Sequence, residues 1–373
     1  MDSPNPTARI TGIETFAVPY PVAGSFKFFT RPARDTVMVR ITSESGETGW
    51  GQSVPSPSWS YETCESVRTT IDAYLAPALI GMDAFDTEAI WRVMNRVIAP
   101  SFSIGQPIAK AGIDLAIFDL TGRILGQSAA QRWQVPEGGS LTLSWTISAS
   151  TLDELHESVA GARARGYHHF NVKVGANAKF DLELCRELRQ LAPASFVWVD
   201  ANGGYDLATA LEVAPKFADL GIAALEQPLP ANHLVPLRAL RRQRALPILL
   251  DEPIVSLDDL RTFHELDLLD GVAMKVSRCG GLTGARRILE YLQAHGLLFF
   301  ASGLTDPDLS LAASLLLFKA CGLQHPAALN GAQYLSGSIL RTPLVITGDQ
   351  AEVPQGPGLG IEVDPDLPPP KTP

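Results

Sequence analysis

Residues 170–281 contain five short apolar runs that end in polar residues: FNVKVG (170–175), SFVWVDANGG (195–204), IAALEQP (222–228), PILLDEP (247–253) and GVAMKVSRCGG (271–281). Apolar runs that alternate with amphipathic segments are typical of parallel strands joined by helices. Two flanking runs, LTLSWTIS (141–148) and LLFFASGLTDPD (297–308), and a short AALNG (327–331) bring the count to eight. Eight such units predict a (β/α) barrel.

The residues before this alternation have a different pattern. Two alternating runs, 10–18 and 36–41, precede apolar residues at helical spacing in 60–79, 87–97 and 108–125. We therefore expect an α+β module over 1–128, a barrel over 129–340 and a segment, 341–373, that returns to the first module. The fold class is α/β.

Ionisable residues fall where the predicted barrel strands end. Lys173, Asp200, Glu226, Asp251 and Lys275 follow one another at intervals of 27, 26, 25 and 24 residues, each close to one strand plus one helix. The carboxyl ends of barrel strands form the active face. A single Asp before a helix is commonly a cap, but three carboxylates between two lysines indicate a catalytic site.

Three converging carboxylates repel one another unless a cation lies between them. Oxygen ligands without histidine or thiolate suit Mg²⁺, or Mn²⁺ in its place. Such a metal would hold a substrate carboxylate and take up charge as an enediolate forms. A lysine whose pKa is lowered nearby is then a suitable base for the proton next to that carboxylate.

The ordered motifs resemble those of the enolase superfamily, specifically its muconate lactonizing enzyme subgroup. The matching stretches are Lys173, Asp200-Ala-Asn202, Glu226-Gln-Pro228, Asp251-Glu252-Pro253 and Lys275-Val-Ser-Arg278-Cys-Gly-Gly. The resemblance implies a modified (β/α)7β barrel with an N-terminal capping domain that the C-terminal segment completes. It also implies a homo-oligomer, from dimer to octamer.

By this resemblance the metal ligands are Asp200, Glu226 and Asp251, and the acid/base pair is Lys173 and Lys275. The resemblance also places Asn202 and Glu252 at positions that line or support the metal site.

This chain also departs from the family pattern. Asn171 stands where the family usually has the first lysine of Lys-x-Lys, so its amide either binds substrate or reflects drift. Ser277 and Asp306 are further candidates for the pocket, and Asp308 either faces the substrate or caps the helix that follows it. The aspartate pair that grips an ammonium in dipeptide epimerases is absent, because the matching stretch reads Ala328-Leu-Asn-Gly331.

Two loops of the first module match the family's lid. Tyr20 to Arg31 would close over the substrate with Phe28 as an apolar contact, and Trp50 to Trp59 would form a second loop with Trp50 as a contact. Aromatic residues at this spacing could equally pack the two domains together.

Composition limits the partners. A net charge of −10 argues against nucleic-acid binding, and no export signal or membrane span is visible among 373 residues. Four cysteines without a C-x-x-C pair fit reduced thiols in a cytoplasm. The expected partner is a small carboxylate.

Two lysines that flank one carbon predict a racemase or epimerase of an amino acid or its derivative. The alternatives are a muconate-type cycloisomerase, a syn-dehydratase or o-succinylbenzoate synthase-like lyase, and a binding protein without catalysis.

Overall fold

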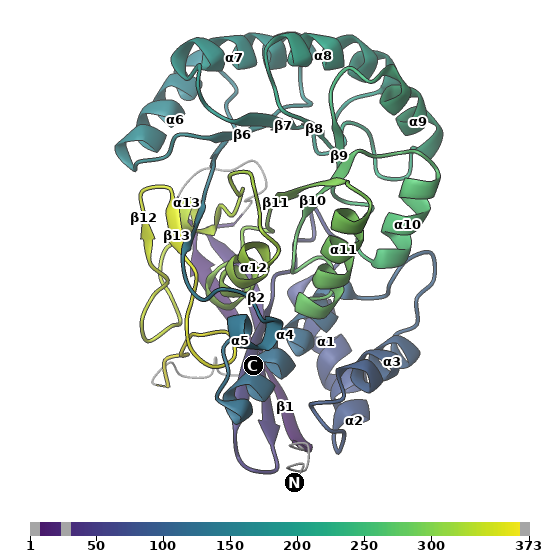
Figure 1. The fold of residues 1–373 in the computed structure, drawn as a ribbon, viewed down its shortest axis with the longest axis vertical. Helices are drawn as coiled ribbons and strands as arrows, with labels where there is room; N and C mark the ends of the chain where they lie inside the picture. Colours follow the sequence, from purple (N-terminus) through teal and green to yellow (C-terminus); the bar gives the residue numbers. More distant parts are fainter. Residues whose placement is uncertain (1–7, 24–30, 366–373) are drawn as a thin grey trace.

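The computed structural model describes residues 8–23 and 31–365, and it has an antiparallel sheet at one end and a parallel sheet ringed by helices at the other (Figure 1). In chain order the elements are β1 (Ile10–Pro21), β2 (Ala33–Ser43), β3 (Thr48–Ser53), α1 (Cys64–Thr69), the π-helix η1 (Thr70–Leu75), α2 (Ala76–Leu79), α3 (Thr87–Val97), α4 (Pro107–Leu125), α5 (Ala129–Trp133), β4 (Ser140–Thr142), β5 (Trp145–Ile147), α6 (Leu152–Ala164), β6 (Phe170–Lys173), α7 (Ala178–Leu191), β7 (Val197–Asp200), α8 (Leu207–Asp219), β8 (Leu225–Glu226), α9 (Leu234–Gln243), β9 (Ile248–Leu250), α10 (Leu257–Glu265), β10 (Gly271–Met274), α11 (Leu282–Ala294), β11 (Leu298–Ala301), α12 (Asp308–Ala320), α13 (Gly331–Tyr334), β12 (Ile346–Thr347) and β13 (Gln350–Glu352).

The capping module is built around the sheet β1-β2-β3, and helix α4 packs on one face of it. Gly49 and Gly51 of β3 make this close packing possible. A Cβ on Gly51 would lie 2.0 Å from the carbonyl oxygen of Gly112 in α4, so only glycine fits. The side chains beside these two glycines on β3 therefore point away from α4.

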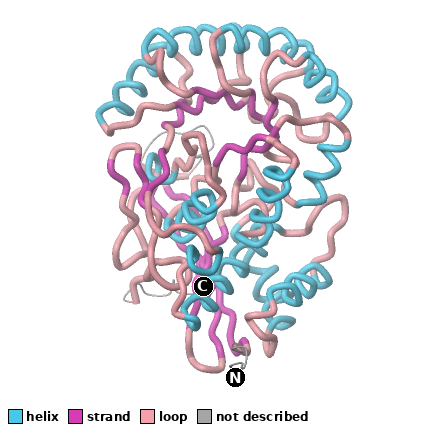
Figure 2. The backbone as a smooth tube through the Cα atoms, viewed as in Figure 1, coloured by secondary structure: helices cyan, strands magenta, loops and turns pink. Residues whose placement is uncertain are grey.

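The barrel sheet has the order β11-β10-β9-β8-β7-β6-β5, with parallel pairing throughout. Figure 2 shows its strands inside an arc of helices. Isolated bridges Leu143↔Ala327 and Ser302↔Ala328 fill the eighth place. The predicted (β/α)7β architecture is confirmed.

The first predicted barrel run, 141–148, is divided between two sheets. Strand β4 pairs with β13 of the C-terminal segment, and β5 pairs with β6. The division falls at Leu143 and Ser144, where the Ser144 N–H donates to the carbonyl oxygen of Ala327 at 2.8 Å. The C-terminal segment thus contacts the barrel before it reaches the capping module.

Farther along, the C-terminal segment returns to helix α4. The Leu359 N–H donates to Asp119 Oδ1 at 2.9 Å, and Arg123 Nη2 donates to the carbonyl oxygen of Ile361 at 2.6 Å. These contacts agree with the expected completion of the capping domain by 341–373, while the domain boundaries stay a prediction.

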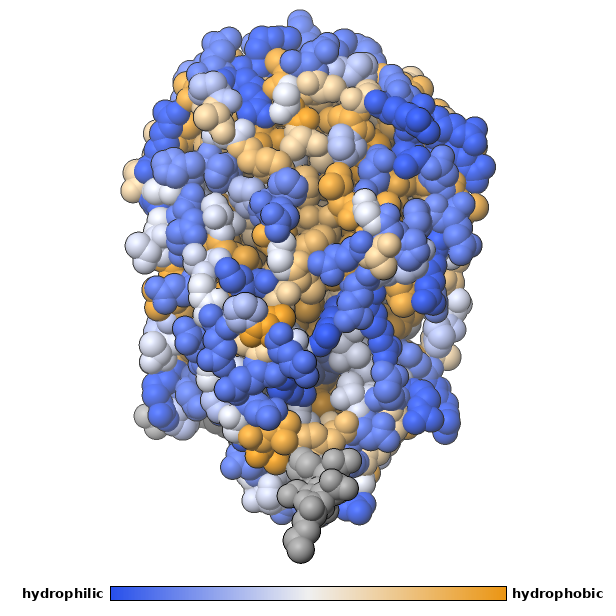
Figure 3. All heavy atoms as spheres, viewed as in Figure 1, coloured by the Kyte–Doolittle hydropathy of each residue, from blue (hydrophilic) through white to orange (hydrophobic). Residues whose placement is uncertain are grey.

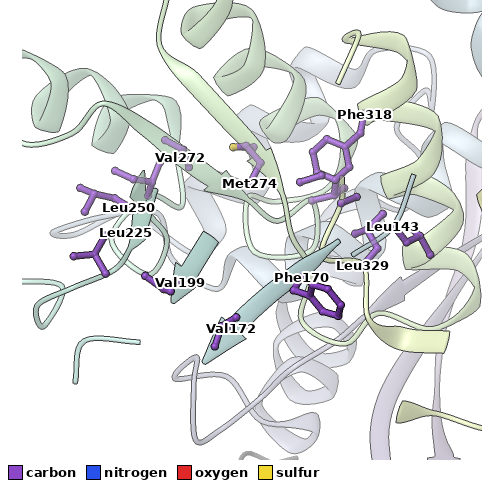
Figure 4. Packing of buried hydrophobic residues seen from close by; sticks show 14 of the residues in the cluster. Leu143, Phe170, Val172, Val199, Leu225, Leu250, Val272, Met274, Phe318 and Leu329 are labelled. Carbon is purple, nitrogen blue, oxygen red and sulfur yellow. The ribbon is translucent and has the colours of Figure 1, made fainter. Parts of the chain in front are cut away.

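Side chains alternate between the two faces of each barrel strand. Val197 and Val199 face the main core shared with the helices, and Trp198 between them belongs to an inner cluster with Leu249 and Phe300. Figure 4 shows outward-facing residues of neighbouring strands side by side, among them Val199, Leu225 and Leu250. The catalytic candidates continue the inward-facing set.

Figure 3 shows hydrophilic residues around the rim of the viewed face, with apolar residues gathered toward its middle. Among residues 8–23 and 31–365, the helices are too short or too polar to cross a membrane.

Candidate active site

The five predicted strand-end residues meet above the inner cluster. Asp200 lies on β7, Glu226 on β8, and Asp251 directly after β9, between the strand of Lys173 (β6) and that of Lys275 (β10). Each follows an inward-facing residue by two positions, so strand alternation directs it into the barrel. All five are buried.

Each lysine ammonium contacts a carboxylate. Lys173 Nζ lies 2.5 Å from Asp200 Oδ2, and Lys275 Nζ lies 2.6 Å from Asp251 Oδ2 and 3.7 Å from Glu226 Oε1. Burial alone would lower the pKa of Lys173, but the carboxylates of Asp200 and Glu226 outweigh it and raise that pKa. Burial and the Asp200 carboxylate raise the pKa of Glu226.

Neighbouring polar groups fix the carboxylates. The backbone and side-chain amides of Asn202 donate to Asp200 at 2.8 and 3.0 Å, and Trp198 Nε1 donates to Glu226 Oε2 at 2.9 Å. Asn202 has a left-handed backbone, with φ of 45°, which lets its side chain fold back onto Asp200. Asn202 therefore orients the Asp200 carboxylate, while its place at a metal site stays a prediction.

The donor chemistry fits a hard divalent cation. Glu226 Oε1 and both oxygens of Asp251 are buried without a well-aligned hydrogen bond, although Lys275 and Arg278 lie close to Asp251. Among the described ranges no three His, Cys, Asp or Glu side chains stand together as a ready ligand set, since the carboxylates face the lysines instead. Buried carboxylate oxygens such as these are the ligands that Mg²⁺ and Mn²⁺ prefer.

The remaining candidates divide into three groups. Ser277 Oγ donates to Asp306 Oδ1 at 2.6 Å, so these two meet after β10 and β11, and burial raises the pKa of Asp306. Asn171 is buried on β6, and its Nδ2 has no partner. Phe28 lies outside the described residues.

Trp50 is not at this site, and the structure corrects its predicted role as a substrate contact. Its ring contacts Phe16 and Arg40 on the face of the capping sheet that α4 leaves open. The physical reason is that Gly49 and Gly51 turn their side of β3 to α4, which directs Trp50 to the opposite face.

Trp59 takes the place in the site that the sequence suggested for Trp50. The centre of its indole ring lies 5.5 Å from Lys173 Nζ, 5.1 Å from Lys275 Nζ and 5.5 Å from the Arg278 guanidinium. Its Nε1 donates to Glu252 Oε1 at 3.0 Å. The ring covers both lysines. In the sequence, this role was indicated by the position of Trp59 at the end of the stretch 50–59, which was predicted to form the second lid loop.

Asp308 does not face the lysines. Its carboxylate accepts hydrogen bonds from Tyr20 Oη at 2.7 Å, Ser338 Oγ at 2.7 Å and the Ile339 N–H at 2.8 Å. It joins β1, α12 and the stretch after α13, so neither the substrate role nor the helix cap describes it.

Comparison with known proteins agrees with this geometry. Residues 154–367 match the enolase C-terminal domain-like model, and residues 11–132 match the N-terminal domain of mandelate racemase / muconate lactonizing enzyme. The chain belongs to the enolase superfamily. Within it, the chain falls in the muconate lactonizing enzyme subgroup.

Its relatives span nearly the whole chain. It is 30% identical to chloromuconate cycloisomerase CbnB of Cupriavidus necator over 366 residues, with 96% of this chain and 97% of the relative covered. It is 26% identical to the N-succinyl-L-Arg/Lys racemase of Bacillus cereus, with 96% of each covered. The structure of 2-chloromuconate cycloisomerase from Rhodococcus opacus 1CP superimposes with a TM-score of 0.86 at 26% identity, over 96% of this chain and 97% of that one.

Proposed function

We propose that this chain isomerises a small carboxylic acid by removing and returning the proton on the carbon next to the carboxylate, as a racemase or epimerase of an amino acid or its derivative. One observation carries the proposal. Two buried lysines, one on β6 and one directly after β10, stand on either side of three carboxylates on or directly after the strands between them. Two such groups can act on opposite faces of one carbon.

In this mechanism Asp200, Glu226 and Asp251 would hold Mg²⁺ or Mn²⁺, which when bound stabilises negative charge on the substrate carboxylate. The neutral form of one lysine takes the proton, and the ammonium of the other returns one to the opposite face. Trp59 excludes water from above both amines. Arg278 and Asn202 keep Asp251 and Asp200 oriented.

Cycloisomerisation is the second candidate, because relatives at up to 30% identity are named muconate or chloromuconate cycloisomerases. One lysine would then transfer the proton, while the other only stabilises charge. The relatives named here are cycloisomerases and a racemase, and the chain is an isomerase.

Exchange of the α-proton in D₂O tests the proposal. The Mg²⁺-loaded enzyme is incubated with pooled free, N-acylated and N-methylated amino acids, and deuterium uptake is followed by mass spectrometry. Lys173→Ala and Lys275→Ala are run beside it. We expect exchange that both variants abolish. If no pool exchanges, and muconate given to the same enzyme loses its absorbance, the cycloisomerase would be established instead.

A further inference from the structure

A compact turn, residues 275–281, joins strand β10 to helix α11 and carries two side chains of the site. The carbonyl oxygen of Lys275 accepts the N–H groups of Arg278 and Cys279, both at 3.1 Å. The side chains of Lys275 and Arg278 both contact the Asp251 carboxylate, at 2.6 and 3.1 Å. Any movement of this turn therefore moves both of these contacts.

Helix α11, at the far end of the turn, takes its cap from the other module. Its own N-cap residue, Gly281, has no side chain that could accept the first N–H groups of the helix. Instead, Oδ2 of Asp114 on helix α4 accepts the Thr283 N–H at 3.0 Å. Trp91 on α3 holds this carboxylate, because its Nε1 donates to Asp114 Oδ1 at 2.8 Å. A buried carboxylate of the capping module thus caps a helix of the barrel.

Two glycines at the end of the turn leave room for these side chains. A Cβ on Gly281 would lie 2.6 Å from Asp114 Oδ2, and a Cβ on Gly280 would lie 2.6 Å from the Trp91 ring. Both distances are too short for a side chain, so the carboxylate and the indole pack directly on the backbone of the turn. The φ angles of Gly280 and Gly281, 78° and 89°, also favour glycine. The end of the turn is therefore shaped to fit the capping module.

We propose that Asp114 is a positioning residue for Lys275 and Arg278: by capping α11 from the capping module, it fixes the turn on which both side chains stand. Removing the carboxylate leaves the Thr283 N–H without its acceptor, which favours states in which the turn is open. The barrel then holds its second lysine in the orientation that the reaction needs only while the capping module is seated on it. The inference rests on the proposed function for the role of Lys275.

A cysteine within the turn reports on its opening without requiring turnover. The Cys279 thiol is buried and donates to the carbonyl oxygen of Ile254 at 3.5 Å, so an alkylating reagent reaches it only when the turn opens. Cys185 is buried on helix α7 and serves as the reference in the same chain. Alkylation of the native protein with iodoacetamide, followed by peptide mass spectrometry, gives both rates. Their ratio separates local opening of the turn from unfolding of the whole protein.

Three variants test the role of the carboxylate. Asp114→Asn keeps one acceptor oxygen, whereas Asp114→Ala loses both. We expect the ratio of the Cys279 rate to the Cys185 rate to rise by about 3- to 10-fold in the asparagine variant and by more than about 10-fold in the alanine variant. Asp119→Asn is the matched control, because Asp119 is also buried on α4 and also accepts a backbone N–H, that of Leu359 at 2.9 Å. Its partner belongs to the C-terminal segment, so this variant should leave the ratio unchanged.

The exchange assay in D₂O adds the catalytic consequence. Asp114→Asn should lower kcat by about 10-fold and change KM by less than about 3-fold, because the orientation of the reacting groups is lost rather than the binding of the substrate. Equal increases at Cys279 and Cys185, the same rise of the ratio in Asp119→Asn, or an unchanged kcat would overturn the proposal. If the wild type exchanges no substrate, the proposed function is refuted, while the cysteine ratio still decides whether Asp114 fixes the turn.

Discussion

Replacing Glu62 with glutamine is expected to flatten the pH dependence of the free energy of unfolding between pH 4.5 and about 7. The Glu62 carboxylate accepts the backbone N–H groups of Ile108 and Ala109, in the first turn of α4, at 2.8 and 2.9 Å. Burial raises its pKa to about 7, because it outweighs these two bonds and the nearby Lys110 ammonium.

The size of the effect follows from the pKa difference between the folded and unfolded chain. The pKa rises from 4.5 to about 7, and each unit corresponds to about 1.4 kcal/mol, so the total is about 3 kcal/mol. Because the folded pKa is the higher one, this contribution is fully present below pH 4.5 and is lost as the pH rises through about 7. Burial lowers the pKa of Lys110 to about 8, so Lys110 stays mainly charged over most of this window.

Denaturant unfolding of both proteins at several pH values from 4.5 to 8 gives the required comparison. Groups that do not interact with Glu62 contribute equally to both and cancel in the difference, and Lys110, whose pKa the Glu62 carboxylate raises, stays mainly charged up to about pH 7. The Glu62→Gln variant loses one acceptor, which destabilises it by a constant amount. The free energy of unfolding of the wild type, minus that of the variant, should therefore fall by about 3 kcal/mol as the pH rises. A difference that stays constant or increases would refute the reasoning.

Three other changes have defined outcomes. Asp251→Asn should weaken Mg²⁺ binding by at least about 10-fold in calorimetric titration, and an unchanged affinity would remove Asp251 from the ligand set. Trp59→Ala should lower kcat/KM by about 10-fold because both lysines lose their aromatic cover, while Trp59→Phe keeps most of the activity; equal losses would assign the effect to the Glu252 bond instead. Gly358→Ala should lower the unfolding free energy by about 1 to 3 kcal/mol, since φ is +67° and a Cβ would lie 2.3 Å from Asp119 Oδ1. Gly46→Ala, at φ +84° in open space, is its control, and equal destabilisation of both would exclude the contact with Asp119 as the cause.

The strand-end residues were predictable because barrel geometry is periodic. An ionisable residue at the end of each successive strand must point into one space, whatever the loops do. This is why the positions of Lys173, Asp200 and Glu226 follow from spacing alone. The expected homo-oligomer and cytoplasmic location stay predictions.

The capping contacts were less predictable because loops set them. Tryptophans stand at both ends of residues 50–59, and the packing of Gly49 and Gly51 on α4 decides that Trp50 lies on the opposite face of the capping sheet, beside Phe16 and Arg40. Trp59 reaches the site through a loop whose path depends on Arg34, which donates to the carbonyl oxygens of Pro55 at 2.5 Å and Leu304 at 3.0 Å. Contacts so distant in sequence leave no local pattern.

The return of the C-terminal segment has a consequence for how the protein is made. Strand β4 pairs with β13, which lies about 210 residues later in the chain, and Asp119 accepts a hydrogen bond from Leu359. Domains generally fold from the N-terminus during synthesis, but here Asp119 of the first module meets Leu359 only after 240 further residues have been synthesised. Until those residues have been synthesised, the edge of α4 and strand β4 stay open to chaperones and to neighbouring nascent chains.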